Sequence, residues 1–151
     1  MAFLFSLNRF YTAETSSLFT TKIAEQVRQF HSKIEGYNPT PLVPLPQLAR
    51  HLGIKALYIK NESFRFGLNA FKVLGGSYAL GQLLAQHLNM DISNIDLKTV
   101  SAKLQKPLLF TTATAGNHGT GVAWAAREMQ QKAVVLCPKV HLRPALTVFT
   151  D

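Results

Sequence analysis

The strongest constraint on the fold of this 151-residue chain is a series of short apolar segments separated by helical patterns. The segments "KALYIKNES" (55–63), "PLLFTTAT" (107–114) and "KAVVLCP" (132–138) are predicted strands. Apolar strands that alternate with helices are typical of a parallel sheet covered on both faces. The sequence therefore predicts an α/β protein with an open, mostly parallel sheet and flanking helices.

Helices are predicted from apolar residues spaced three to four apart and from stop signals, at residues 16–34, 45–54, 70–88 and 121–131. Gly53 is the expected C-cap of the second. The stretch 35–46 contains four prolines, which forbid a helix and favour extended backbone. Residues 89–106 are predicted to be a linker.

The net charge of +8 raises the question of an anionic partner. The basic residues are spread along the chain, however, and no basic run, zinc-ligand spacing or aromatic RNA signature accompanies them. A solvated basic surface is the favoured interpretation, no metal site is predicted, and a basic nucleic-acid-binding module is the weaker hypothesis.

Cys137 is the single cysteine, so no internal disulfide can form and a reducing compartment is expected. No apolar run approaches the length needed to span a bilayer, and Arg9 follows the first apolar residues instead of preceding them. We expect a cytoplasmic protein that does not bind a membrane.

Lys72 lies in an apolar run, after Phe71 and before Val73. It either snorkels to solvent or does chemistry, because desolvation and the positive end of a helix both favour a neutral, nucleophilic amine. Gly75 and Gly76 each cost about 1 kcal/mol within a helix. They fit either a flat ligand close to the backbone or tight helix packing, and the sequence leaves both open.

The segment "TATAGNHGTG" (112–121) matches neither a dinucleotide fingerprint nor a P-loop. Its backbone N–H groups at a helix N-terminus could receive a carboxylate or phosphate, and Asn117 adds an amide donor. His118 is an acid or base candidate, although a structural loop histidine is preferred. This segment and "FRFGLNAFK" (64–72) both follow predicted strands, so we expect them to face one site.

The two longest stretches that carry these motifs, residues 39–80 and 111–129, resemble diaminopropionate ammonia-lyase, of the fold-type II, tryptophan-synthase-β-like group of pyridoxal-phosphate (PLP) enzymes. The resemblance covers about residues 31–139. The segment "RFGLNAFKVLGGSYA" (65–79) is specific for this family within the group. We expect residues 1–151 to be the N-terminal part of a lyase catalytic domain, with 140–151 a divergent tail.

The resemblance implies that Lys72 forms the imine with PLP beside Phe71 and also acts as a base, and that Asn117 binds the cofactor's ring oxygen. It implies that the loop from Thr114 to His118 holds the substrate carboxylate, a loop whose candidate residues are Thr114, Ala115, Gly116 and His118. The expected reaction is elimination of ammonia from the small amino acid 2,3-diaminopropionate, with hydrolysis to pyruvate and a second ammonia. A homodimer is implied for the full-length family.

Two departures from the family pattern stand out. Ala115 occupies the position where the family has an aspartate expected to remove an α-proton, and a methyl group cannot do so. After residue 139 the sequence no longer follows the family, and the later glycine-rich loop for the cofactor phosphate is not found. We therefore expect a fragment with impaired activity, and the alternative is an inactive remnant or non-catalytic subunit.

Overall fold

The computed structural model describes residues 8–12, 16–17 and 19–137. The predicted divergent tail, residues 140–151, lies outside this part of the chain. The described elements, in chain order, are α1 (Thr21–Ser32), β1 (Leu42–Pro44), α2 (Pro46–Leu52), β2 (Tyr58–Lys60), η1 (Glu62–Phe64), α3 (Lys72–His87), η2 (Ile92–Asn94), η3 (Val100–Lys103), β3 (Leu109–Ala113), α4 (Asn117–Glu128) and β4 (Lys132–Leu136).

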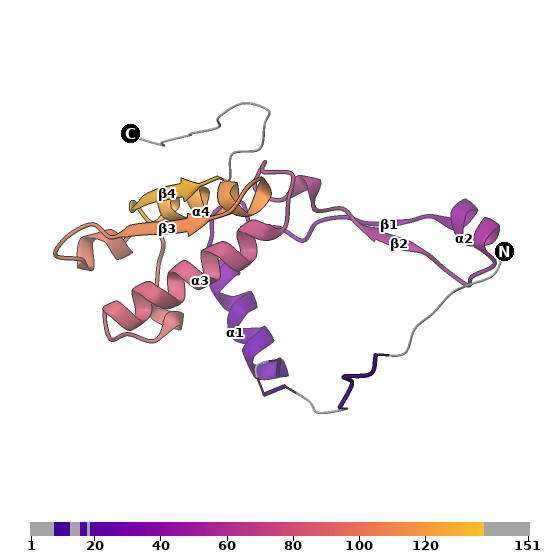
Figure 1. Ribbon diagram of the computed structural model, residues 1–151, viewed down its shortest axis with the longest axis horizontal. Helices are drawn as coiled ribbons and strands as arrows, with labels where there is room; N and C mark the ends of the chain where they lie inside the picture. The colour runs from indigo at the N-terminus through magenta and orange to yellow at the C-terminus, as the bar shows by residue number, and fades with distance from the viewer. Residues whose placement is uncertain (1–7, 13–15, 18, 138–151) are drawn as a thin grey trace.

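The parallel part of the fold is a two-stranded βαβ unit. β3 and β4 pair in parallel, from Leu109 opposite Lys132 to Ala113 opposite Leu136, and α4 connects them. α4 packs against both strands, α3 packs against α4, and α1 packs against α3 (Figure 1). The predicted α/β class and its parallel strands are confirmed for this region.

The predicted strand at residues 55–63 does not join that sheet, which corrects the expectation of one parallel sheet. Only Tyr58–Lys60 of this segment form a strand, β2, which pairs antiparallel with β1, with Val43 opposite Ile59. β1 belongs to the proline-rich stretch that was expected only to be extended. Proline is tolerated there because β1 is an edge strand of a two-stranded ribbon.

The four predicted helices are all present, with shifted ends. α1 begins after the N-cap Thr20, whose side chain accepts a hydrogen bond from the N–H of Ile23, and α2 ends at the predicted Gly53 in a left-handed conformation. α4 begins at Asn117, four residues before the predicted start. The last turn of the glycine-rich segment is therefore helical and not a loop.

The core lies where α1, α3 and α4 meet β3. The predicted linker at residues 89–106 contributes to it, because its 3-10 helices bury Ile92 and Val100, and Ile95 and Leu97 between them are buried too. The linker interpretation was wrong, since a polar stretch with widely spaced aliphatic residues shows no clear period. The buried cluster comprises Phe30, Ile34, Leu80, Leu84, Ala85, Ile92, Ile95, Leu97, Val100, Phe110, Val122, Ala125, Ala126 and Met129.

The ribbon and its helix form a separate projection, which we call the arm, residues 42–60. β1, α2 and β2 extend away from the packed helices (Figure 1). Among the described residues, no helix is both long and apolar enough to cross a lipid bilayer.

Candidate active site

Lys72 is the first residue of α3, two residues after the predicted start of this helix at Ala70 and still within the expected first turn. Phe71 is the N-cap and is 60% exposed, whereas Val73 is buried. The side chain of Lys72 is itself exposed, so the expected desolvation by neighbouring apolar residues is not found among the described residues. Its amine makes no hydrogen bond or ion pair with any of them.

Close contact between two helices fixes the position of Lys72. A Cβ placed on Gly121 of α4 would lie 2.9 Å from the Cα of Val73 and 3.3 Å from the carbonyl carbon of Lys72. α4 therefore touches the backbone of α3 at its first turn. Asn117 lies four residues before Gly121, on the same face of α4. Lys72 and Asn117 thus begin two helices that are in contact, at neighbouring ends.

Gly75 and Gly76 turn out to differ. A Cβ on Gly76 would meet the backbone of Gly121 and Val122 at 3.5 Å, so this glycine serves helix packing. A Cβ on Gly75 would have no atom within 4 Å, and Gly75 is exposed on the side of α3 that carries Lys72, three residues earlier. Tight helix packing is thus confirmed for Gly76, and the open space at Gly75 leaves room for a flat ligand, which stays a prediction.

The N-terminus of α4 is formed by Gly116, whose φ of 67° and ψ of −143° suit only glycine. The chain turns there from β3 into α4. No described residue accepts a hydrogen bond from the N–H groups of Asn117, His118 or Gly119. These N–H groups are available to an anionic ligand, as the sequence predicts.

The remaining loop residues have different environments. The N–H of Thr114 donates to the carbonyl of Leu136 at 2.9 Å, which ties the loop to the end of β4. Ala115 and Gly116 are exposed. His118 is half-buried, and its side chain makes no hydrogen bond within the described part of the chain, so the preferred interpretation of a histidine satisfied by nearby backbone is not supported.

An ion pair between buried Arg65 and partly buried Glu62, which the sequence reasoning missed, lies at the base of the arm. Arg65 also begins the loop that leads to Lys72, which we call the lysine loop. Arg65 is 5% exposed, and its Nε donates to Glu62 at 3.0 Å while Nη1 donates to the carbonyl of Asn38 at 2.8 Å. Thr40 donates to the same carboxylate, and Lys60 donates to the carbonyl of Thr40. The hydrogen bond from Arg65 is the main cause of a lowered pKa at Glu62.

The loop between Arg65 and Lys72 has an unusual backbone. Phe66 and Asn69 have φ values of 49° and 55°, in the left-handed region that bulky side chains avoid. The ring of Phe66 stacks on Trp124 of α4, with centroids 4.7 Å apart. This contact joins the loop to the helix that carries Asn117. No local sequence pattern predicts the contact between Phe66 and Trp124.

Contacts of His31 in α1 also hold the first turn of α3. His31 is buried, and its Nε2 lies 2.8 Å from the carbonyl of Leu74 in the first turn of α3. Ser77 lies 3.3 Å from the same nitrogen, and Tyr37 stacks on the imidazole. Burial is the main cause of a lowered pKa at His31. α1 thereby supports the turn that presents Lys72.

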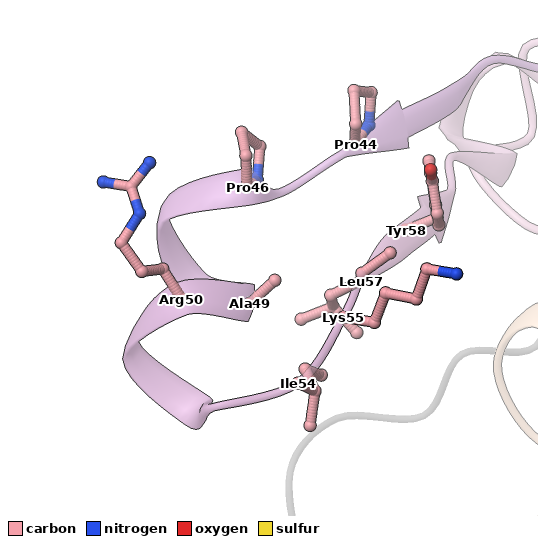
Figure 2. Close-up of a pocket in the computed structure, with 9 residues that line it drawn as sticks. Pro44, Pro46, Ala49, Arg50, Ile54, Lys55, Leu57 and Tyr58 are labelled. Carbon is pink, nitrogen blue, oxygen red and sulfur yellow. The ribbon is translucent and has the colours of Figure 1, made fainter.

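An open pocket of about 390 Å³ lies elsewhere, in the arm, between α2 and the β1–β2 ribbon (Figure 2). None of its lining residues belongs to the candidate site. The chemistry-bearing residues instead lie on an open surface at the starts of α3 and α4. No cluster of three or more His, Cys, Asp or Glu side chains suited to a metal ion occurs in the described residues.

Comparison with known families gives one match to most of the chain. The profile of the family described as "Pyridoxal-phosphate dependent enzyme" matches residues 34–144. Diaminopropionate ammonia-lyase of Escherichia coli K12 is 48% identical over 132 residues, and that of Salmonella typhimurium LT2 is 47% identical over 135. Both matches cover 87% of this chain and 33% of the relative, so the chain spans about a third of the length of these relatives.

Solved structures agree with the sequence matches. The crystal structure of the E. coli diaminopropionate ammonia-lyase in complex with D-serine has a TM-score of 0.81 at 48% identity, over 87% of this chain and 34% of that one. The complex of the same enzyme with an aminoacrylate–PLP azomethine reaction intermediate has a TM-score of 0.78, over 87% of this chain and 33% of that one. The fold of the described chain is thus that of one third of such an enzyme.

Proposed function

Because the chain belongs to the family of pyridoxal-phosphate-dependent enzymes, we propose that it forms the lysine-bearing part of an ammonia-lyase acting on 2,3-diaminopropionate. In the proposed reaction one molecule of diaminopropionate and one of water give pyruvate and two of ammonia. The observation that carries the proposal is the contact of α3 and α4 at Gly121, which brings the starts of the two helices, Lys72 and Asn117, to one surface.

The residues at this surface fit the cofactor. An exposed amine stands at Lys72, open space lies over Gly75, and three N–H groups are free at the start of α4. Lys72 would hold the cofactor through its amine, with Phe71 beside it, and Asn117 would donate to its ring oxygen. When bound, PLP would supply the electron sink for the bonds at the substrate's α-carbon.

The chain's own groups would orient the substrate and move its proton. The loop from Thr114 to His118, with the N–H groups of α4, would bind the substrate carboxylate. The Nζ of Lys72 would take up the α-proton as the β-amine leaves. Orientation of this kind accounts for about 7–11 kcal/mol of a barrier, and the fixed α3–α4 contact is what this chain contributes to it.

Covalent trapping tests the assignment of Lys72. The purified chain is incubated with PLP, reduced with borohydride and digested, and the modified peptides are identified by mass spectrometry. We expect the PLP label on Lys72 in clear excess over other exposed lysines such as Lys22 and Lys103. Lys72→Ala should lose that label and keep the others, and equal labelling of all exposed lysines would contradict a cofactor role for Lys72.

A further inference from the structure

The first turn of α3 has little in its own sequence to hold it. Its N-cap is Phe71, which provides no side-chain hydrogen bond to the turn, and a helix without a capping side chain begins less stably. Gly75 and Gly76 follow within the same turn and the next, and glycine is less favourable in a helix than any residue except proline. The turn that begins at Lys72 therefore depends on contacts from elsewhere in the fold.

His31 of α1 supplies one such contact. Its Nε2 lies 2.8 Å from the carbonyl oxygen of Leu74, which belongs to that first turn. A carbonyl oxygen can only accept, so Nε2 carries the proton and donates it. The hydroxyl of Ser77 donates to the same oxygen at 3.1 Å. Two donors, one from α1 and one from α3 itself, thus converge on one backbone atom.

Packing fixes the direction in which the imidazole of His31 donates. Tyr37 stacks on the ring with centroids 5.9 Å apart and 17° between the planes, and Phe30 meets it edge-on with centroids 5.4 Å apart. The residue is 4% exposed, and a buried polar ring is unfavourable unless it is hydrogen-bonded. The bond to the Leu74 carbonyl is therefore needed by the imidazole and aimed at one atom of α3.

Leu74 passes this restraint on to Lys72. Its N–H donates to the carbonyl of Phe71 at 3.0 Å, and Lys72 lies between these two residues. His31 therefore fixes one end of the short segment that contains Lys72, while the backbone contact with α4 fixes the segment from the other helix. A reactive group keeps one geometry when hydrogen bonds and packing around it lock the backbone that carries it.

We propose that His31 is a positioning residue for Lys72: its hydrogen bond to the Leu74 carbonyl replaces the missing cap of α3 and holds the turn that presents the amine to the cofactor. The inference rests on the proposed function for the role of Lys72. Because His31 is buried, it acts through the backbone of α3 and not on the reacting atoms.

Two substitutions separate the hydrogen bond from the packing of the ring. His31→Gln keeps an N–H donor at about the reach of Nε2, whereas His31→Phe keeps a flat ring against Tyr37 but has no donor. The parent and each variant are incubated with PLP at neutral pH and reduced with borohydride, and the label on Lys72 is expressed relative to the label on exposed Lys103. We expect His31→Phe to lower this ratio about two- to tenfold, the effect of one hydrogen bond, and His31→Gln to keep it.

Hydrogen exchange gives a second readout that does not need the cofactor. The amide of Leu74 should exchange about two- to tenfold faster in His31→Phe than in the parent, and at the parent rate in His31→Gln. The amide of Ala24, which donates to Thr20 in the first turn of α1, should keep the parent rate in both variants. His51→Phe, the same substitution at an exposed histidine, is the matched control and should change neither readout.

The outcomes distinguish this inference from the proposed function. Equal labelling of Lys72 and Lys103 in the parent would contradict the proposed function, and exchange of the Leu74 amide would then decide whether His31 holds the turn. An unchanged label and unchanged exchange in His31→Phe would overturn the inference, and so would equal losses in His31→Phe and His31→Gln, which would assign the effect to ring packing. If His31→Phe does not fold, His31→Asn replaces it, because its amide is one methylene too short to reach the Leu74 carbonyl.

Discussion

Lys72 owes its position to contacts made by its neighbours. The amine itself has no partner among the described residues, but the residues around it are fixed on three sides: Val73 against Gly121, Leu74 against His31, and Phe66 against Trp124. Because the backbone around Lys72 is already held in place, a ligand that binds there has to order only the flexible lysine side chain.

His31 predicts a pH dependence of stability. Burial lowers its pKa below the ordinary 6.5, with Arg65 adding to the effect and the Leu74 carbonyl opposing it. The folded state therefore holds the neutral imidazole, and the unfolded state binds the proton first as pH falls. The contribution of His31 to the free energy of unfolding should be constant above about pH 6.5 and should decline below it. Urea unfolding at a series of pH values measures this decline.

The contribution of His31 is isolated by comparison. His31→Gln should flatten the decline between pH 6.5 and 5, whereas His51→Gln, at an exposed position on α2, should leave it as in the parent. An unchanged decline in His31→Gln would assign the effect to other groups.

Ala115 predicts poor turnover of the diaminopropionate stereoisomer whose reaction depends on the aspartate of the family pattern. It is exposed just before the turn at Gly116, where a carboxylate would stand at the site surface. With this chain in place of the matched third of the E. coli lyase, Ala115→Asp should raise turnover of one diaminopropionate stereoisomer about 100-fold to 10,000-fold more than the other, since a positioned base serves one face of the substrate. Pyruvate release from each isomer measures this, with Ala115→Asn as the control, and equal gains would contradict the role.

At the scale of elements, α3 and α4 approach one another closely because small residues line their contact. Gly121 and Gly76 leave no side chain between the two backbones, and Gly81 gives Phe30 of α1 the same access to α3. A methyl group added at Gly121 would push the two helices apart. This contact is therefore sensitive to substitutions, such as glycine to alanine, that would be harmless elsewhere.

Gly121→Ala should lower the free energy of unfolding by about 1–3 kcal/mol, because the new Cβ would lie 2.9 Å from the backbone of Val73. Gly75→Ala is the control, since both changes improve helix propensity but only Gly121 lacks room. Gly75→Ala should raise stability by about 0.5–1 kcal/mol. Urea unfolding of the two variants checks this, and similar values would exclude a close backbone contact.

The whole molecule consists of a packed body of α1, α3, α4 and the β3–β4 pair, and an arm whose faces are uncovered in the described chain (Figure 1). At the base of the arm, Arg65 pairs with Glu62 and donates to the carbonyl of Asn38, and Thr40 donates to the carboxylate of Glu62. The same contacts of Arg65 and Glu62 therefore set the orientation of both the arm and the lysine loop.

We expect the chain alone, with saturating PLP, to release no more ammonia or pyruvate from either diaminopropionate stereoisomer than Lys72→Ala does. The glycine-rich phosphate loop implied by the family resemblance has no counterpart in its sequence, and an imine without orientation lacks most of the rate gain. Coupled assays of both products measure this. Turnover well above the Lys72→Ala control would show that the present residues suffice.

The sequence by itself determined the elements whose signals are local. The α/β class, the presence of the four helices and the stop of α2 at Gly53 follow from period, capping and backbone freedom within a few residues, whereas α3 and α4 begin at Lys72 and Asn117, two residues after and four before their predicted starts. The motifs at residues 65–79 and 111–129 were enough to indicate the family.

Only the tertiary structure decided what depends on partners distant in the chain. The folded chain paired β2 with β1, packed Gly76 against α4 and left Gly75 in open space. It also buried the supposed linker and placed Arg65 against the carbonyl of Asn38. A periodic pattern shows that a residue needs cover but not which surface provides it, because burial is a property of segments that meet only after the chain has folded.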